Sequence, residues 1–316
     1  MQNNVEKRGT STIYNIRFAN LTDLHDYLKG NPVVNRRVFA RQASIKNDYD
    51  FSGEDLDTSI GYCIGGYRQG FENFLMSNTK LKETTHDLTD NRSLTRTLYG
   101  GMPLSPLVAA GVPDCMLKYE RDAKSSVRNI YFNLAYPAYT TTSRIVNRGL
   151  ATLYIIQALE AKGEMINFKA FELSKVDDEI VNIEINLKKP GDLFLDVEKC
   201  YYPIKAKEFL RRVLFRVLES SDVQEFYWGD GYGTAMSEEE IRKFYNVRKQ
   251  DLVISYPSEM GIEGMDIYDD TITLIEKLGL EKDFDIPKIK RLQEREQENN
   301  IIKYTIRCIF FWIMIW

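Results

Sequence analysis

The chain has 316 residues, of which 43% are hydrophobic and 12% aromatic, so it can bury one large α/β core with additions. Its 42 basic and 46 acidic side chains give a formal charge of -4, and this balance provides no broad positive surface for a nucleic-acid backbone. The composition therefore argues against disorder and against a nucleic-acid partner.

The cysteines and histidines do not form a metal-binding pattern. The four cysteines are far apart, contain no CxxC pair and are accompanied by only two histidines, so we expect reduced core thiols. The N-terminal residues are charged and are not followed by an apolar run, which argues against a secretory signal. We therefore expect a soluble, cytoplasmic protein.

Residues 1–98 are predicted to form a mostly helical and irregular N-terminal extension. Residues 21–28 have apolar side chains at helical spacing after Asn20 or Thr22 as the cap, and residues 52–76 form a second helical region. Residues 77–97 are polar and are predicted to be a long connection. We expect both helical regions to brace a larger domain.

Residues 99–284 are predicted to form a Rossmann-like α/β domain, with a mainly parallel sheet and helices on both faces. Apolar runs predict strands at 127–134, 164–171, 179–187 and 252–256. Amphipathic segments predict the intervening helices at 143–162, 206–218 and 269–278. Such alternation is typical of parallel sheets, in which ligands bind beyond the carboxyl ends of the strands. We therefore expect a site in the loops that start at Asn133, near Asp192 and after Tyr256.

The order strand, loop, long helix and strand, with Leu-Glu-Ala-Lys-Gly at 159–163 ending the helix, resembles a von Willebrand factor A (vWA) domain. Over residues 99–280 the fuller pattern resembles vWA-like proteins of tailed bacteriophages. Three further segments carry this resemblance, at residues 101–103, 111–116 and 210–215. The resemblance implies a phage or mobile-element protein that works in the host cytoplasm beside a protein partner, such as an AAA+ ATPase.

The resemblance also implies a degenerate metal-ion-dependent adhesion site. The family places Asp-x-Ser-x-Ser after the first strand, because a divalent cation needs converging oxygen ligands. The matching positions are Asn133, Ala135 and Pro137, which lack the carboxylate and both hydroxyls. We therefore expect no cofactor.

A different alignment would let Thr140 and Ser143, with Asp192, hold Mg²⁺. However, one hydroxyl in the run from Thr140 to Ser143 is also needed to cap the following helix, which is the reading that we favour.

Other polar segments complete the set of candidate binding residues. The acidic cluster of Asp192, Asp196 and Glu198 follows Pro190 in what is predicted to be an ordinary turn. The glycine-rich segment 228–234 lacks the lysine of a phosphate-binding loop and is predicted to be a contact loop. Ser237 and Glu240 match a capping box. The candidate binding residues are Asn133, Tyr136, Thr140, Thr142, Asp192 and Asp230.

The C-terminal segment combines a charged stretch with an apolar tail. Residues 285–300 are predicted to be an exposed helix or linker. The sixteen residues 301–316 are apolar, but they include Lys303 and Arg307 and are shorter than a usual bilayer span. Three roles stay open for this tail: docking into its own domain, an interface in a homo-oligomer, or contact with a membrane surface.

Three function classes remain, and the preferred one is a non-enzymatic protein-interaction module. The first alternative is a divalent-metal-dependent binding domain that uses residues 140–143 with Asp192 or Asp196. The second is a hydrolase or nuclease with dispersed acidic residues. The sequence has no nucleophile beside a histidine and no cofactor fingerprint, so an enzyme would need residues that only the fold brings together.

Overall fold

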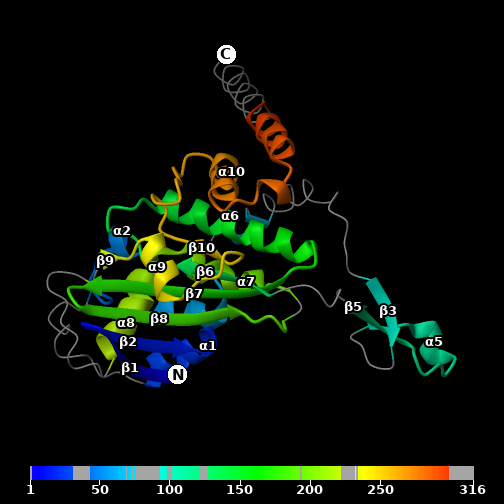
Figure 1. The fold of residues 1–316 in the computed structure, drawn as a ribbon, viewed down its shortest axis with the longest axis horizontal. Helices are drawn as coiled ribbons and strands as arrows, with labels where there is room; N and C mark the ends of the chain where they lie inside the picture. Colours follow the sequence, from blue (N-terminus) through cyan, green and yellow to red (C-terminus); the bar gives the residue numbers. More distant parts are fainter. Residues whose placement is uncertain are drawn as a thin grey trace, which may run out of the picture.

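The computed structural model describes residues 2–30, 43–68, 70–72, 74–75, 93–97, 102–120, 127–192, 194–221, 232 and 234–298. Its main body is a seven-stranded sheet packed against helices (Figure 1), which confirms the predicted α/β class. A second, three-stranded sheet is drawn to the side of this body and consists of β3 (Ser93–Thr97), β4 (Met102–Pro103) and β5 (Met116–Glu120), with the short helix α5 (Ser105–Ala109).

The main sheet has the strand order β1-β2-β8-β7-β6-β10, with β9 beside β7. Its parallel part is β7 (Met165–Val176), β6 (Val127–Asn133) and β10 (Leu252–Ile254). Next to it, β8 (Glu179–Lys188) and β9 (Thr234–Ala235) both run antiparallel to β7. The sheet is therefore mixed, and the antiparallel hairpin of β7 and β8 reverses the direction of the strands beyond it.

The N-terminal third belongs to the same body, which corrects the prediction of a mostly helical extension. β2 (Ser11–Phe18) pairs with β8 in parallel, and β1 (Gln2–Arg8) pairs with β2 in an antiparallel hairpin. The β-branched and aromatic residues of β2 are buried from Ile13 to Ile16, because both faces of this strand are covered. The expected boundary at residue 99 also moves, since residues 93–120 form the separate sheet and the main body resumes at Val127.

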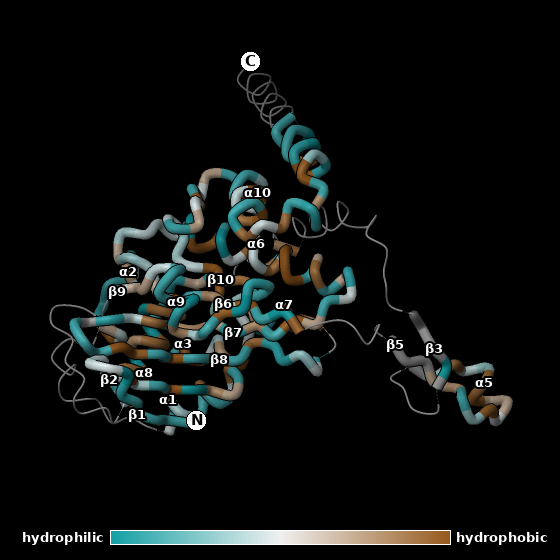
Figure 2. The backbone as a smooth tube through the Cα atoms, in the orientation of Figure 1, coloured by the Kyte–Doolittle hydropathy of each residue, from teal (hydrophilic) through white to brown (hydrophobic). Residues whose placement is uncertain are grey.

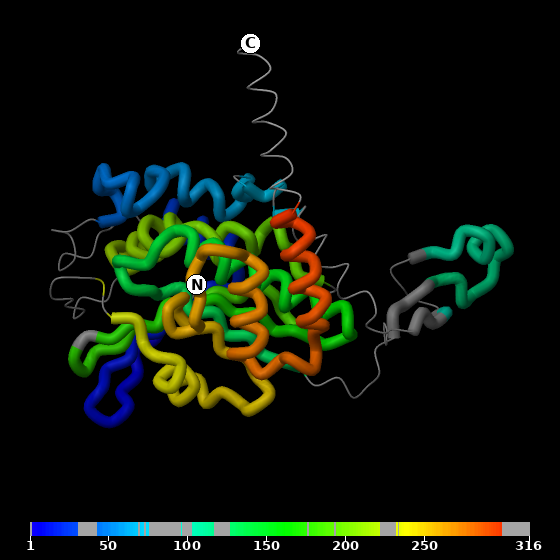
Figure 3. The backbone as a smooth tube through the Cα atoms, turned by 90° about the horizontal axis from the view of Figure 1, so that it is seen from above, coloured from blue at the N-terminus to red at the C-terminus, as the bar shows by residue number. Residues whose placement is uncertain are grey.

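Helices cover the two faces of the main sheet unequally. In β6, Ile130 and Phe132 contribute to a large core on one face, and Tyr131 contributes to a small core on the other. The large core lies under the following helices: α1 (Leu21–Gly30), α3 (Leu56–Gly65), α6 (Thr142–Ala161), α7 (Val197–Lys205), α8 (Phe215–Ser220) and α10 (Ile267–Lys277). The small core lies under α9 (Glu238–Phe244), which occupies the opposite side of the sheet in Figure 3.

Local sequence signals explain where most helices begin. The Asn20 side chain accepts a hydrogen bond from the Asp23 N–H, at 2.9 Å, at the start of α1. Ser237 and Glu240 form the predicted capping box of α9. The segment predicted as one helix at 206–218 instead contains a π-helix, η1 (Phe209–Leu214), which continues into α8. Cys63 and Cys200 are buried, unpaired thiols, as predicted, whereas Cys115 is unpaired but only partly buried and lies outside the core.

The C-terminal part of the described chain is a hydrophilic helix. After α10, a 3₁₀ turn (Glu281–Asp283) leads into a helix over residues 286–298, which is mostly exposed and coloured as hydrophilic in Figure 2. The apolar tail at 301–316 lies outside the described residues. Among the residues that are described, no helix has both the length and the apolar character needed to cross a bilayer.

Helix α6 approaches α7 closely at Gly149. A Cβ atom at this position would lie 2.4 Å from the carbonyl oxygen of Ile204, so the contact leaves no space for a side chain. By contrast, a Cβ atom at Gly61, in the middle of α3, would meet nothing within 4 Å. These two helical glycines therefore form a matched pair.

We expect Gly149→Ala to destabilise the protein by about 1–3 kcal/mol or more, because the backbone of α7 would have to move. Gly61→Ala should be neutral or stabilising by up to about 1 kcal/mol, because alanine is the better helix former. Urea unfolding of both variants measures the difference. Equal effects would show that α6 and α7 are not in close contact.

Candidate functional site

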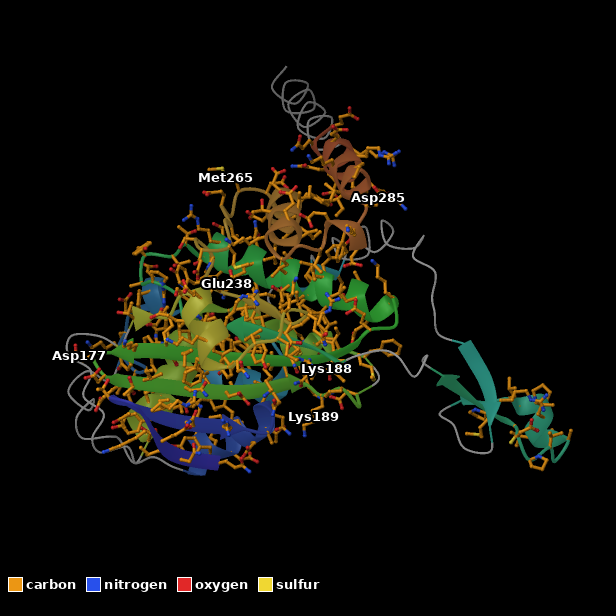
Figure 4. The ribbon with its side chains drawn as sticks, viewed as in Figure 1. Asp177, Lys188, Lys189, Glu238, Met265 and Asp285 are labelled. Carbon is orange, nitrogen blue, oxygen red and sulfur yellow. The ribbon has the colours of Figure 1, made fainter. Side chains whose placement is uncertain are left out.

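A pocket of about 750 Å³ opens at the carboxyl ends of β6 and β7, where the alternating pattern predicted a site. We call it the strand-end pocket. Among its lining residues are Tyr136 and Tyr139 of the loop after β6, Glu172 and Ser174 of β7, Arg211 and Phe215 of η1 and α8, and Lys46, Phe51, Tyr232 and Tyr256. In Figure 4, Asp177 marks the edge of the sheet near this pocket, and Lys188 and Lys189 mark the opposite edge.

Glu172 is the acidic residue of the strand-end pocket. Only 1% of its surface is exposed, and the Ser174 hydroxyl donates a hydrogen bond to its Oε1 at 3.1 Å. Its Oε2 is buried and has no hydrogen-bond partner among the described residues. Burial raises the pKa of Glu172 to about 8, because the charged form loses its hydration. The carboxyl is therefore mostly protonated at neutral pH.

Arg211 forms part of the pocket wall. Its Nη1 donates to the carbonyl oxygen of Phe51 at 2.6 Å, and its Nη2 donates to that of Ala138 at 2.9 Å. The guanidinium carbon also lies 3.9 Å from the centre of the Phe51 ring and 5.3 Å from that of Tyr136. The contacts of Arg211 therefore connect the loop after β6 to residues 43–54, which we call the N-terminal segment.

Arg212, the next residue of η1, holds the same N-terminal segment through its backbone. Its Nη1 donates to the carbonyl oxygens of Ser44 and Lys46, at 2.9 Å and 2.7 Å. Its Nε donates to the carbonyl oxygen of Glu54 at 2.7 Å. The side chain is 1% exposed, so the guanidinium supplies the donors that water would otherwise provide to these carbonyls.

A buried carboxylate, Glu219, positions a second part of the wall. It accepts hydrogen bonds from the Ser44 N–H at 3.1 Å, from the Ser44 hydroxyl, and from the Tyr232 hydroxyl at 2.5 Å. The ring of Tyr232 stacks on Phe215 with 3.9 Å between centroids and 4° between planes. Glu219 therefore connects the N-terminal segment to Tyr232 and places two aromatic rings at the pocket.

Beneath the loop after β6, Arg148 provides a fixed positive charge. Its Nη1 donates to the carbonyl oxygens of Asn133 at 2.9 Å and Ser255 at 2.7 Å, which follow β6 and β10 respectively. Its guanidinium carbon lies 4.3 Å from the centre of the Phe132 ring. Burial lowers the pKa of Arg148 to about 9, because the cation has lost water.

Several predicted site residues lie at this edge of the sheet. Tyr136 lines the pocket, and its hydroxyl donates to the Lys207 carbonyl oxygen at 3.4 Å. Asn133 is buried, its Oδ1 accepts from the Ala135 N–H at 3.0 Å, and its Nδ2 has no partner among the described residues. Thr140 is buried, and Thr142 is the exposed first residue of α6.

The helix cap of α6 differs from the expected one. Its N-cap residue is Thr141, within the predicted run, but no side-chain hydrogen bond caps the helix. Instead, the hydroxyls of Thr141 and Ser143 lie 3.2 Å apart.

The structure does not bring Asp192 to the strand-end pocket. Because β8 runs antiparallel to β7, its carboxyl end lies beside Phe168, near the start of β7. The Lys188 ammonium donates to the carbonyl oxygens of both Ile166 and Asp192, at 3.4 Å and 3.0 Å. The hypothetical ligands Thr140 and Ser143 therefore lie at the opposite edge of the sheet from Asp192.

The acidic cluster at 192–198 has local structural roles. Asp192 accepts from the Lys189 N–H at 2.8 Å within a turn, and Asp196 accepts from the Lys199 N–H at 3.2 Å as the N-cap of α7. These contacts confirm the turn that was predicted here. Asp230 lies outside the described residues. Within the described part of the chain, no group of three or more His, Cys, Asp or Glu side chains is placed to hold a metal ion.

The sequence did reveal a signal for Glu172, although we did not predict it. Ile166, Phe168 and Ala170 occupy alternate positions of β7 and contribute to the large core. Glu172 and Ser174 continue this alternation, so two polar side chains follow three apolar ones on the same face of the strand. The other pocket residues come from distant segments, and no local pattern marked them.

Comparison with known protein families gives one match. The model of a family described as a domain of unknown function (DUF7192) matches residues 3–282. No curated protein and no solved structure matches the chain. The matched range includes the N-terminal hairpin as well as β6 to α10, in agreement with their common sheet.

We expect Arg212→Ala to cost on the order of 3 kcal/mol or more in the free energy of unfolding, because the carbonyls of Ser44, Lys46, Gly53 and Glu54 all lose a charged donor. Arg291→Ala is the control, since this arginine is exposed and, in the described part of the chain, donates to a carbonyl of its own helix. Urea denaturation of both variants gives the comparison. Similar losses would mean that the carbonyl contacts of Arg212 contribute little.

The variant Glu172→Gln tests whether the buried carboxyl makes the stability of the protein depend on pH. Between the ordinary glutamate pKa of 4.5 and the folded pKa of about 8, the folded state binds more protons than the unfolded state, so the stability of the natural chain falls as pH rises. The glutamine variant lacks this proton uptake. Its stability relative to the natural chain should therefore rise from pH 5 to pH 8, by up to about 1.4 kcal/mol per pH unit.

Chemical denaturation at several pH values measures this difference. The matched control is Glu239→Gln, which changes an exposed carboxyl on α9 and should show a much smaller slope. A flat difference for the Glu172 variant would show that this carboxyl is not desolvated.

Proposed function

We propose that this chain, which belongs to the DUF7192 family, is a non-enzymatic recognition module that holds a protein partner at the strand-end pocket. The observation that carries the proposal is the pocket itself, which lies at the carboxyl ends of parallel strands and is lined by aromatic side chains. Tyr139 is 77% exposed at its edge and is available for contact. Exposed aromatic side chains of this kind are common at protein interfaces.

The proposal includes a vWA-type scaffold with a degenerate metal-ion-dependent adhesion site. The unit of β6, α6 and β7 supports it, because its order of strand, loop, long helix and strand is the one on which the resemblance rests. The positions that match the adhesion motif are Asn133, Ala135 and Pro137, and two of these have no side-chain oxygen. This scaffold would serve recognition without a catalytic function.

Arg148 supports recognition without a divalent cation. Its guanidinium bridges the carbonyls that follow β6 and β10, at the end of the sheet where a bound cation would lie. A divalent cation beside this guanidinium would therefore compete with Arg148 for these two carbonyl oxygens. We therefore propose that neither Mg²⁺ nor another cofactor takes part in binding.

The partner class and the setting follow from the same resemblance. Phage and bacterial vWA-like proteins work beside AAA+ ATPases, so we propose an ATPase of that class as the partner. The setting would be the cytoplasm of a bacterial host, with the chain encoded by a phage or mobile element.

Capture of the partner tests the proposal. The natural chain should retain an AAA+ ATPase from a lysate of the cells, or phage-infected cells, that encode it, and EDTA should not change the recovery. Tyr139→Ala should lower recovery by at least about tenfold, as expected for an aromatic residue at the centre of an interface.

Phe194→Ala is the matched control for this capture, because Phe194 is 52% exposed and lies two residues from Asp192, at the opposite edge of the sheet. Its recovery should equal that of the natural chain. Equal losses for both variants, loss with EDTA, or no partner above background would contradict the proposal.

A further inference from the structure

The strand-end pocket contains a buried carboxyl group with one unused oxygen. Glu172 is 1% exposed, and Ser174 donates to its Oε1, whereas its Oε2 has no hydrogen-bond partner among the described residues. When Glu172 is ionised, this oxygen is a buried acceptor without a donor, which costs free energy, and a ligand that supplies the donor recovers this cost. The pocket therefore favours a ligand that brings N–H groups.

The positive side chains around the pocket do not supply this donor. The two terminal nitrogens of Arg211 donate to the carbonyls of Phe51 and Ala138. Arg148 donates to carbonyls below the loop after β6. Lys46 is exposed, and it forms no ion pair with Glu172 within the described part of the chain. An ionised Glu172 would therefore be a buried negative charge that no positive side chain among the described residues neutralises.

Aromatic rings form much of the remaining wall. Six of them line the pocket, from Phe51, Tyr136, Tyr139, Phe215, Tyr232 and Tyr256. Ring faces carry partial negative charge and attract cations, and apolar rings also pack against alkyl chains. Arg211 and Lys46 also line the pocket, but the terminal nitrogens of Arg211 are engaged by carbonyls, so the preference for a cation comes from the ring faces and the ionised carboxyl of Glu172.

We propose that the strand-end pocket binds a primary ammonium group at the end of an alkyl chain, of the kind that a lysine side chain of the protein partner carries. This inference rests on the proposed function and specifies the chemistry of the partner's contacting residue. The alkyl stem packs against the rings, and the ammonium donates to the Oε2 of Glu172. Such a bond to an ionised carboxylate is stronger than a neutral one.

Proton release gives the binding a second signature. An ammonium ion favours the ionised form of Glu172, and burial holds the pKa of this carboxyl at about 8 in the empty pocket. The affinity should therefore rise roughly tenfold per pH unit between pH 6 and about pH 8.

The groups that line the pocket with Glu172 do not obscure this dependence. The charged side chains that line it with Glu172 are Arg211 and Lys46, and Ser174 is uncharged. Burial raises the pKa of Tyr136 to about 12 and also raises the pKa of Tyr256, so both stay neutral.

Calorimetric titration of the full chain with Nα-acetyl-lysine methylamide tests the proposal. The control ligand carries a second acetyl group on Nε, which removes the charge and keeps the alkyl stem. At pH 8 the charged ligand should bind at least tenfold more tightly than the acetylated one, and its advantage should shrink at pH 6. Glu172→Gln should weaken binding at least tenfold, whereas Glu239→Gln, which changes an exposed carboxyl on α9 outside the pocket, should leave it unchanged.

Equal affinities for the two ligands would overturn the proposal, and this comparison needs no variant that has to fold. Unchanged affinity in Glu172→Gln, or an equal loss of affinity in Glu239→Gln, would also overturn it. Pentane-1,5-diamine is the third ligand, and tighter binding of this free diamine than of the lysine derivative would overturn the assignment to a partner's lysine.

The capture experiment separates the two proposals. Capture that depends on Tyr139 but not on Glu172 would overturn the ammonium site and leave the recognition function in place. Capture that does not depend on Tyr139 would overturn the recognition function itself.

Discussion

Backbone carbonyl groups that are removed from water need hydrogen-bond donors, and this need determines how the segments around the strand-end pocket are held together. Arg211 and Arg212 lie side by side on the π-helix η1 and donate to carbonyls of the N-terminal segment and of the loop after β6. Because the same two segments form walls of the strand-end pocket, the shape of the pocket depends on the arginine pair. π-Helical turns are frequently found at functional sites.

Charge is distributed unevenly around this pocket. The buried cations Arg148, Arg211 and Arg212 lie among carbonyl dipoles and aromatic rings, and in the described part of the chain none of them pairs with a carboxylate, although the Nε of Arg148 has no partner there. Among the described residues, the acidic Glu172 accepts a hydrogen bond from a serine hydroxyl alone. In a medium of low polarity, a satisfied cation contributes to structure, whereas an unsatisfied acid carries a free-energy cost that only binding or protonation relieves. The buried arginines therefore hold the structure together, and the buried carboxyl of Glu172 is the group available for recognition.

The sequence predicted local features well and long-range pairing poorly. Periodicity located β6, α6 and α10 because each buries a regular pattern of side chains, and the capping box marked the start of α9. The N-terminal hairpin was missed, because its partner β8 is far along the chain and strand pairing leaves no local mark. We predicted Asp192 at the end of the sheet where β6 and β7 end, but it lies at the opposite end, because the antiparallel hairpin of β7 and β8 reverses the direction of β8.

The pairing of β2 with β8 has a consequence for biosynthesis. Thr12 lies opposite Glu179, so β2 leaves the ribosome long before its partner β8 has been translated. During that interval the apolar side chains between Ile13 and Phe18 lack their eventual neighbours. During synthesis, this part of the sheet can therefore be completed only after β8 has emerged.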